Sequence, residues 1–203
     1  MDPRIVLASA SPRRRALLAA LGVPFDVVTS GAEEVHEGTV PAAIVEANAR
    51  AKRDDVAARL DRPAIVIAAD TLVFLDEHVL PKPADRDEAF RMLRQLSGNT
   101  HQVVTGLAIV DTAGGRAVEG SETTDVTFRK LSDAQIRRFI DIVNPLDRAG
   151  AYTVDGPGSL LVARYDGCYQ NVLGLPMVRL DRLLAEMGVD LGAHMNPDAA
   201  SFL

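Results

Sequence analysis

The sequence predicts an α/β protein with one central twisted mixed sheet, and three observations lead to this fold class. Apolar β-branched runs and amphipathic helical segments mix along the whole chain. The 203 residues are 47% hydrophobic and 25% charged, which is ordinary for a compact protein with a sizeable core. Neither an internal repeat nor a low-complexity linker divides the sequence. We therefore expect a single domain over residues 1–191 and a C-terminal tail over 192–203, where the periodicity is weak.

The first elements are a strand, a helix and a second strand. An apolar run over 5–8 predicts a short strand, and a helical pattern follows it. Ser11 is placed to cap this helix, with Pro12 at its first position and Gly22 just past its end. The residues over 25–29 predict the second strand.

A long helix and a buried strand come next. The helix opens at Thr39-Val40-Pro41 and runs to about Leu60. Its apolar positions define a buried stripe that includes Ile44, Ala47 and Ala51. A continuous apolar run over 64–69 then predicts a central strand that ends at 70–71. Open α/β sheets bind ligands at the carboxyl ends of their strands, so functional residues are expected there.

The middle of the chain predicts a hairpin, a helix and two long strands. The hairpin spans 72–80, and the helix is capped by Asp85 and stopped by Gly98. Residues 101–111 and 116–130 are rich in β-forming side chains and are joined by a glycine-containing turn.

Two further helices complete the predicted elements. Ser132 and Gln135 have the spacing of a capping box, so they mark a helix start. The last helix begins near Pro176 and ends at Gly188.

The charge balance excludes several classes of partner. The 22 basic and 28 acidic residues give a net charge of -6, which repels polyanionic duplexes. Aromatic residues make up only 4% and tryptophan is absent, so a stacking surface for single strands is not supported either. Nucleic acid polymers are therefore not expected as partners.

The compartment follows from cysteine use and hydropathy. The single cysteine, Cys168, excludes an internal disulfide and fits a reducing compartment. No apolar run approaches the ~20 residues of a membrane span, and the first apolar stretch is too short for a signal peptide. We expect a cytoplasmic protein without a membrane partner. The four histidines share no ligand spacing, and neither a Walker loop nor a dinucleotide fingerprint is present.

The segment between the first strand and the first helix has the composition of a phosphate site. The segment Ser9-Ala10-Ser11-Pro12-Arg13-Arg14-Arg15 brings hydroxyls and three guanidinium groups to a helix N-terminus, which already offers free backbone donors. Taken alone, the same residues also fit an ordinary helix cap with solvated arginines.

Two lysines add to this set. The chain has only three lysines, and Lys82 stands between Pro81 and Pro83, which stiffen its loop. Lys52 lies one turn beyond Asn48 on the long helix. A triphosphate needs several cations that converge from different segments, although either lysine by itself also fits a solvated surface position.

Two carboxylates are candidates for catalysis and metal binding. Asp70 follows a buried apolar run, where burial and a neighbouring cation or metal can hold it ready to act on a water molecule. Glu33 and Glu34, in the loop after the second strand, can add a carboxylate to a magnesium site, since magnesium takes one or two carboxylates plus phosphate oxygens and water. The alternatives are a turn-capping role for Asp70 and a solvated glutamate at Glu33.

Six blocks of the sequence, in order, resemble the Maf nucleotide pyrophosphatases. They are Leu7-Ala8-Ser9-Ala10-Ser11-Pro12-Arg13-Arg14, Ala68-Ala69-Asp70-Thr71, Pro81-Lys82-Pro83, Ser97-Gly98 with His101 and Val104-Thr105-Gly106, Gly150-Ala151-Tyr152, and Tyr169-Gln170-Asn171-Val172-Leu173-Gly174-Leu175-Pro176. The resemblance implies an elongated, two-lobed fold related to the inosine triphosphatase architecture, with the nucleotide in the cleft between the lobes. It also implies a homodimer.

The same resemblance implies an activity and roles for the residues. The activity is hydrolysis of a nucleoside triphosphate to the monophosphate and pyrophosphate with a divalent cation, Mg or Mn, as cofactor, and it extends to the removal of non-standard nucleotides. Asp70 resembles the proton acceptor and a metal ligand, and Glu33 the second carboxylate. The phosphate-binding set is Ser9, Arg13, Lys52 and Lys82, which Arg14 of the opening block joins.

Base preference divides the family into subgroups. Arg13 and Thr71 resemble the subgroup that acts on dTTP and UTP, so Thr71 is expected to bind substrate. Asp155 stands where that subgroup usually has glutamine, and an aspartate accepts hydrogen bonds but does not donate them as an amide does. A subgroup that acts on 7-methyl-GTP has an acidic residue in this region but resembles the chain less at Arg13. We expect the dTTP/UTP type.

Two functions from other classes compete with the enzyme. The family has been linked to septum formation, so one alternative is a regulator of cell division that acts by binding a partner and does not need Asp70. The other is a nucleotide-binding module without turnover, against which the presence of Asp70 and Glu33 argues.

Overall fold

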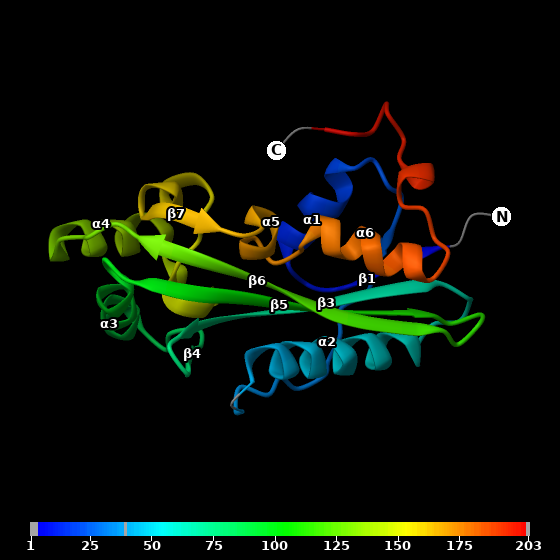
Figure 1. The fold of residues 1–203 in the computed structure, drawn as a ribbon, viewed down its shortest axis with the longest axis horizontal. Coiled ribbons are helices and arrows are strands. Elements are labelled where there is room, and N and C mark those ends of the chain that lie inside the picture. Colours follow the sequence, from blue (N-terminus) through cyan, green and yellow to red (C-terminus); the bar gives the residue numbers. More distant parts are fainter. Residues whose placement is uncertain (1–3, 39, 202–203) are drawn as a thin grey trace.

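The computed structural model describes residues 4–38 and 40–201, which form one sheet with helices on both faces (Figure 1). The strands are β1 Ile5–Ala8, β2 Asp26–Val27, β3 Ile65–Leu75, β4 His78–Leu80, β5 Thr100–Asp111, β6 Ala117–Phe128 and β7 Val162–Asp166. The helices are α1 Pro12–Ala20, α2 Pro41–Ala57, α3 Arg86–Leu96, α4 Asp133–Val143, α5 Tyr169–Val172 and α6 Met177–Glu186. Short 3-10 turns are η1 Pro145–Asp147, η2 Ala149–Ala151, η3 Gly156–Leu160 and η4 Gly192–His194.

The sheet is mixed, which confirms the predicted α/β class. Its order is β2-β1-β3-β5-β6-β7, and β4 also pairs with β3. β1 runs parallel to β2 and β3, whereas the pairs from β3 to β7 and the β3–β4 hairpin are antiparallel. α2 lies along one face, and α1 and α6 lie on the other (Figure 1).

The predicted helix caps are confirmed. The Ser11 side chain accepts a hydrogen bond from the amide of Arg14, and Asp85 accepts one from the amide of Glu88. Ser132 forms the predicted capping box with Gln135 at the start of α4. Local side chains therefore fix where these three helices begin.

The boundaries of other elements differ from the prediction. The second strand is limited to the two residues of β2, and neither β7 nor the 3-10 turns were predicted, because short irregular segments have little periodicity. Thr39, at the predicted start of the long helix, lies outside the described residues, and α2 begins at Pro41.

The predicted buried stripe of α2 is wrong at two of its three positions. Ile44 is buried, but Ala47 is exposed and Ala51 is only half-buried. The buried positions instead recur every three or four residues and include polar side chains: Ile44, Val45, Asn48, Ala49, Lys52, Arg53 and Val56. The pattern of apolar residues did not reveal this face because some of its buried residues are polar. Asn48 and Lys52 are buried because they contact Asp70.

β3 does not end at Asp70 as predicted but continues to Leu75. Its first four residues pair with β1 and its last three pair with β4, while β5 pairs along the other edge. The edge of β3 between these two partners, residues 69–72, is therefore open. Asp70 lies in this opening rather than at a strand end.

The apolar core has two main parts, one at each end of the elongated sheet (Figure 1). One cluster joins β4, α3, α4 and the adjoining ends of β5 and β6, and it includes Leu93, Phe128 and Phe139. The other joins β1, α1, α6 and the opposite end of the sheet, and it includes Leu7 and Leu18. The long strands β3 and β5 contribute to both clusters, so the opening in β3 lies between the two parts of the core.

Two further features complete the fold. In the tail, the amide of Asn196 donates to the carbonyl of Gly22, and the amide of Ser201 donates to that of Ala20, which ties the segment to the end of α1.

Among the helices of the part that the structure describes, none combines the length and the apolar character that crossing a bilayer requires.

Candidate active site

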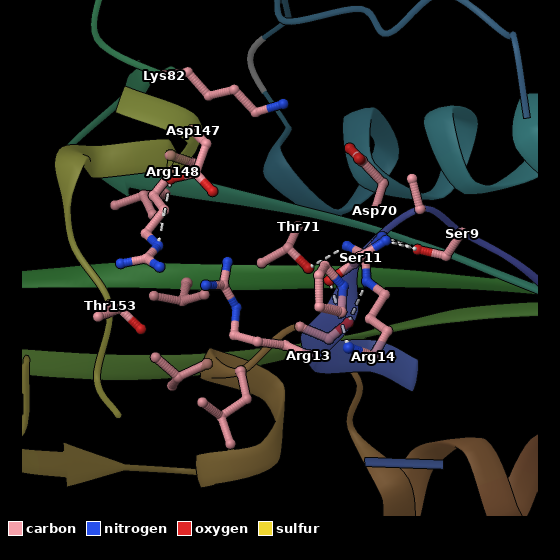
Figure 2. Close-up of a pocket in the computed structure, with 18 of the residues that line it drawn as sticks. Ser9, Ser11, Arg13, Arg14, Asp70, Thr71, Lys82, Asp147, Arg148 and Thr153 are labelled. Atoms are coloured by element: carbon pink, nitrogen blue, oxygen red, sulfur yellow. Dashed lines mark hydrogen bonds and ion pairs between the residues drawn. The ribbon is translucent and has the colours of Figure 1, made fainter. Parts of the chain in front are cut away.

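A cavity of about 360 Å³ lies at the open edge of β3. Seven of the predicted site residues line it: Ser9, Arg13, Arg14, Lys52, Asp70, Thr71 and Lys82. They come from the β1–α1 loop, α1, α2, β3 and the loop after β4, and Figure 2 shows several of them around the cavity. The fold thus brings together residues that are far apart in the sequence.

Asp70 is buried, with 4% of its surface exposed, and both of its carboxylate oxygens are engaged from α2. One oxygen contacts the Lys52 ammonium at 2.7 Å, and the other accepts a hydrogen bond of 2.9 Å from the Asn48 amide. Lys52 also contacts Glu34 at 2.7 Å, so it bridges two carboxylates. These contacts explain why α2 buries Asn48 and Lys52, whereas the buried Arg53 pairs with Glu119 and Asp54.

The environment of Asp70 keeps it ionised. Burial disfavours the charged carboxylate, but the charge and hydrogen bond of Lys52, the Asn48 amide and the charge of Arg14 outweigh burial and hold the Asp70 pKa below its ordinary value. Asp70 is therefore an anion at neutral pH, fixed in one orientation by α2.

The loop before α2 is tied to the same helix. Asn48 exchanges two hydrogen bonds of 2.8 Å with the backbone of Val35, one as acceptor and one as donor. Further along, Asp55 accepts hydrogen bonds from the Ser30 hydroxyl and the Gly31 amide. Asn48 thereby couples the position of the Glu34 loop to the position of Asp70.

This loop presents Glu34, and not Glu33, to the cavity. Glu34 lines the cavity and pairs with Lys52. Glu33 is exposed and stands outside the cavity lining, as far as the described residues show. The two neighbours cannot be separated by composition alone, because only the loop conformation decides which one turns inward.

Arg14 and Thr71 hold the walls of the cavity together. The Arg14 guanidinium donates to the carbonyls of Gly174 (2.7 Å) and Ala69 (2.8 Å), to the Thr71 hydroxyl (2.9 Å) and to that of Ser9 (3.4 Å). These bonds use four of its five N–H groups and join α1, β3 and the loop before α6. Arg14 was predicted as a substrate ligand, but its donors are largely used within the protein.

Arg13 and Lys82 point toward the cavity without such partners. Among the described residues, neither side chain has a hydrogen bond or an ion pair. Burial and the nearby charge of Arg148 lower the Arg13 pKa, while Asp155 and Asp147 oppose that shift. Both residues are free to bind an anion, as the sequence predicted for them.

Comparison with known proteins gives the family of this chain. A family model described as Maf-like protein matches residues 4–187. The chain belongs to the Maf family. Among its relatives, the dTTP/UTP pyrophosphatase of Moorella thermoacetica is 50% identical over 189 residues, covering 93% of this chain and 97% of the relative. That of Pelotomaculum thermopropionicum is 45% identical over 188 residues, covering 92% and 98%.

One solved structure resembles this Maf family member in part. It is a nucleoside-triphosphatase (dITP/XTP pyrophosphatase) from Mycobacterium abscessus, with a TM-score of 0.44 and 20% identity. The matching region covers 62% of this chain and 74% of that one.

Several cavity residues of this Maf family member were not predicted from the sequence. They are Asp147, Arg148, Tyr152 and Thr153. Arg148 and Tyr152 flank or belong to the Gly150-Ala151-Tyr152 block, so closer attention to the neighbours of that block would have found them. Asp155 stands outside the lining in the described part of the chain, where it accepts a hydrogen bond from the Thr153 hydroxyl.

The donor set fits a magnesium-type cation. No group of three or more acidic, histidine or cysteine side chains that could hold a metal occurs within residues 4–38 and 40–201. However, Asp70 and Glu34 reach the same ammonium, and one or two carboxylates are what Mg²⁺ takes when substrate oxygens and water complete its shell.

Proposed function

We propose that this chain hydrolyses nucleoside triphosphates of the dTTP/UTP type to the monophosphate and pyrophosphate. The observation that carries the proposal is a buried, ionised Asp70 at the wall of a cavity that also holds Arg13 and Lys82. The names of relatives at 45–50% identity support it. The expected removal of non-standard nucleotides would use the same chemistry.

In the proposed reaction, the oxygen of a water molecule attacks the α phosphorus. The bond between this phosphorus and the oxygen that bridges to the β phosphate breaks, and pyrophosphate leaves. Asp70 orients the water and accepts its proton, while Arg13 and Lys82 neutralise the phosphates. No covalent intermediate is required, because pyrophosphate leaves readily once its charge is held.

The contact between Lys52 and Asp70 links substrate binding to the strength of the base. Lys52 donates to Asp70 and Glu34, which leaves one of its three N–H groups for a phosphate oxygen. A phosphate that draws the ammonium away from Asp70 adds negative charge beside it, and both changes raise the Asp70 pKa. These two changes make Asp70 a stronger base than in the free protein, before the charge of a bound cation is taken into account.

We propose that Asp70 and Glu34 hold the divalent cation, in place of the predicted pair Asp70 and Glu33. When bound, Mg²⁺ or Mn²⁺ would neutralise phosphate charge and polarise the phosphoryl oxygens. Glu34 depends on Asn48 for its position, since Asn48 fixes the loop at Val35.

We propose that the segment around Asp155 recognises the base of the nucleotide. Thr153 lines the cavity and donates its hydroxyl to Asp155, so the carboxylate orients a group at the cavity wall. We also propose that the protein acts in the cytoplasm and forms a homodimer.

The function is tested by incubating the protein with standard and modified nucleoside triphosphates and Mg²⁺ or Mn²⁺, and identifying both products. Release of pyrophosphate and a monophosphate, fastest from dTTP and UTP, is expected. Release of orthophosphate and a diphosphate, or no release from any substrate, would overturn the proposal.

A further inference from the structure

Arg148 reaches the cavity from the turn between η1 and η2. Its amide donates to the carbonyl of Pro145, and its backbone is extended. The side chain is 22% exposed and lines the cavity. A neighbouring turn is held as well, since the Gly150 amide donates to the carbonyl of Pro81, next to Lys82. The loops that carry Arg148 and Lys82 are therefore fixed relative to one another.

The guanidinium of Arg148 is poorly satisfied within the protein. Its Nε is buried and has no hydrogen bond among the described residues. Its ion pair, with Asp147, is 3.5 Å long, and the Asp147 side chain is 75% exposed. A solvated carboxylate at this distance stabilises a charge only weakly. A buried donor without a partner costs free energy, and this cost indicates that a bound ligand supplies the missing acceptor.

A second arginine faces it. Figure 2 shows the guanidinium groups of Arg13 and Arg148 pointing toward one another from opposite walls of the cavity. Their proximity is also the second cause, after burial, of the lowered Arg13 pKa. Two like charges held together with only peripheral carboxylates repel each other, and an anion between them removes that repulsion. Lys82 lines the same cavity and adds a third cation.

We propose that Arg148 binds the polyphosphate of the nucleotide together with Arg13, and that the sequence-predicted phosphate-binding set is incomplete without it. The inference rests on the proposed function for the identity of the natural ligand. The ligand chemistry it names, an oligophosphate, does not depend on turnover. Arg14, by contrast, belongs to the walls of the site, because its donors are used by the protein.

The experiment uses inorganic triphosphate, which has the phosphate chain of the nucleotide but no sugar or base. Its affinity for the full chain with Mg²⁺ is measured by calorimetry for wild type, Arg148→Gln and Arg138→Gln. Arg138 is an exposed arginine of α4 and is the matched control. Pyrophosphate release from dTTP is measured on the same samples. Thermal melting shows whether each variant is folded, and Arg148→Met, which keeps the apolar stem, replaces the glutamine variant if that one does not fold.

We expect Arg148→Gln to weaken triphosphate binding at least tenfold and to raise the KM for dTTP by a similar factor, with Arg138→Gln unchanged. Equal triphosphate binding by wild type and Arg148→Gln would overturn the inference, as would weakened binding of dTTP alone, which would place Arg148 on the nucleoside. Absence of detectable triphosphate binding to wild type would also overturn it. Arg148-dependent binding without pyrophosphate release from any nucleotide would support the anion site and refute the proposed function.

Discussion

Gly106 allows α2 to pack closely against the sheet, and this packing sets the geometry of the site. It pairs with Asp70 across β3 and β5, so a side chain at this position would point toward the same face as the Asp70 carboxylate. A Cβ at Gly106 would lie 2.4 Å from the carbonyl carbon and oxygen of Val45. Asn48 and Lys52, which hold Asp70, lie one and two turns further along the same helix.

The effect of Gly106→Ala follows from these distances. An ordinary contact begins near 3.4 Å, so α2 has to move away from the sheet by about 1 Å. Because the obstacle is helix backbone rather than the end of a flexible side chain, we expect a loss of about 1–3 kcal/mol in the free energy of unfolding. A displacement of about 1 Å of the groups that position Asp70 is expected to reduce kcat/KM about 100-fold.

The two effects are measured separately, by urea unfolding and by pyrophosphate release at a temperature where the variant is folded. Gly31→Ala is the control, since no atom lies within 4 Å of the added Cβ, and it should change stability by less than about 0.5 kcal/mol. A Gly106→Ala protein with wild-type stability and activity would refute the link between helix packing and catalysis.

Two other predictions concern the metal and the response to pH. Glu34→Gln should raise the Mg²⁺ concentration needed for half-maximal activity about tenfold or more, while Glu33→Gln should not, and the reverse order would show that Glu33 is the ligand. Burial lowers the pKa of His101, which contacts the Tyr152 hydroxyl at 2.7 Å, from 6.5 to about 4. Between these values the unfolded chain binds more protons, so stability falls as the pH drops below 6.5, by about 2 kcal/mol at pH 5. Urea unfolding at pH 7 and 5 should show this loss in wild type and a correspondingly smaller loss in His101→Gln; equal losses would contradict the assignment.

The parts of the fold that the sequence predicted are those with strong local signals. Ser11, Asp85 and Ser132 cap their helices because each side chain satisfies a backbone amide a few residues away. The predicted end of β3 at residues 70–71 was wrong because Asp70 and Thr71 interrupt an apolar run without interrupting the strand. Their polarity comes from the site and not from a change in backbone structure.

The site shows a similar division. Asp70, Lys52 and Lys82 were predicted and line the cavity. The preference for Glu34 over Glu33 and the inward position of Arg148 depend on loop conformations, which no periodic pattern encodes. The buried polar face of α2 could not be predicted either, since Asn48 and Lys52 are buried because Asp70 across the interface satisfies them.

The central claim is that Asp70 is the group that orients and deprotonates the attacking water, and kcat for dTTP in Asp70→Asn tests it most directly. Asparagine keeps the volume of the side chain but cannot accept the proton, and Glu34 remains to pair with Lys52. We predict a fall in kcat of about 10² to 10⁴, with KM changed only a few-fold and the fold retained. A folded Asp70→Asn enzyme whose kcat stays within about threefold of wild type would contradict the mechanism.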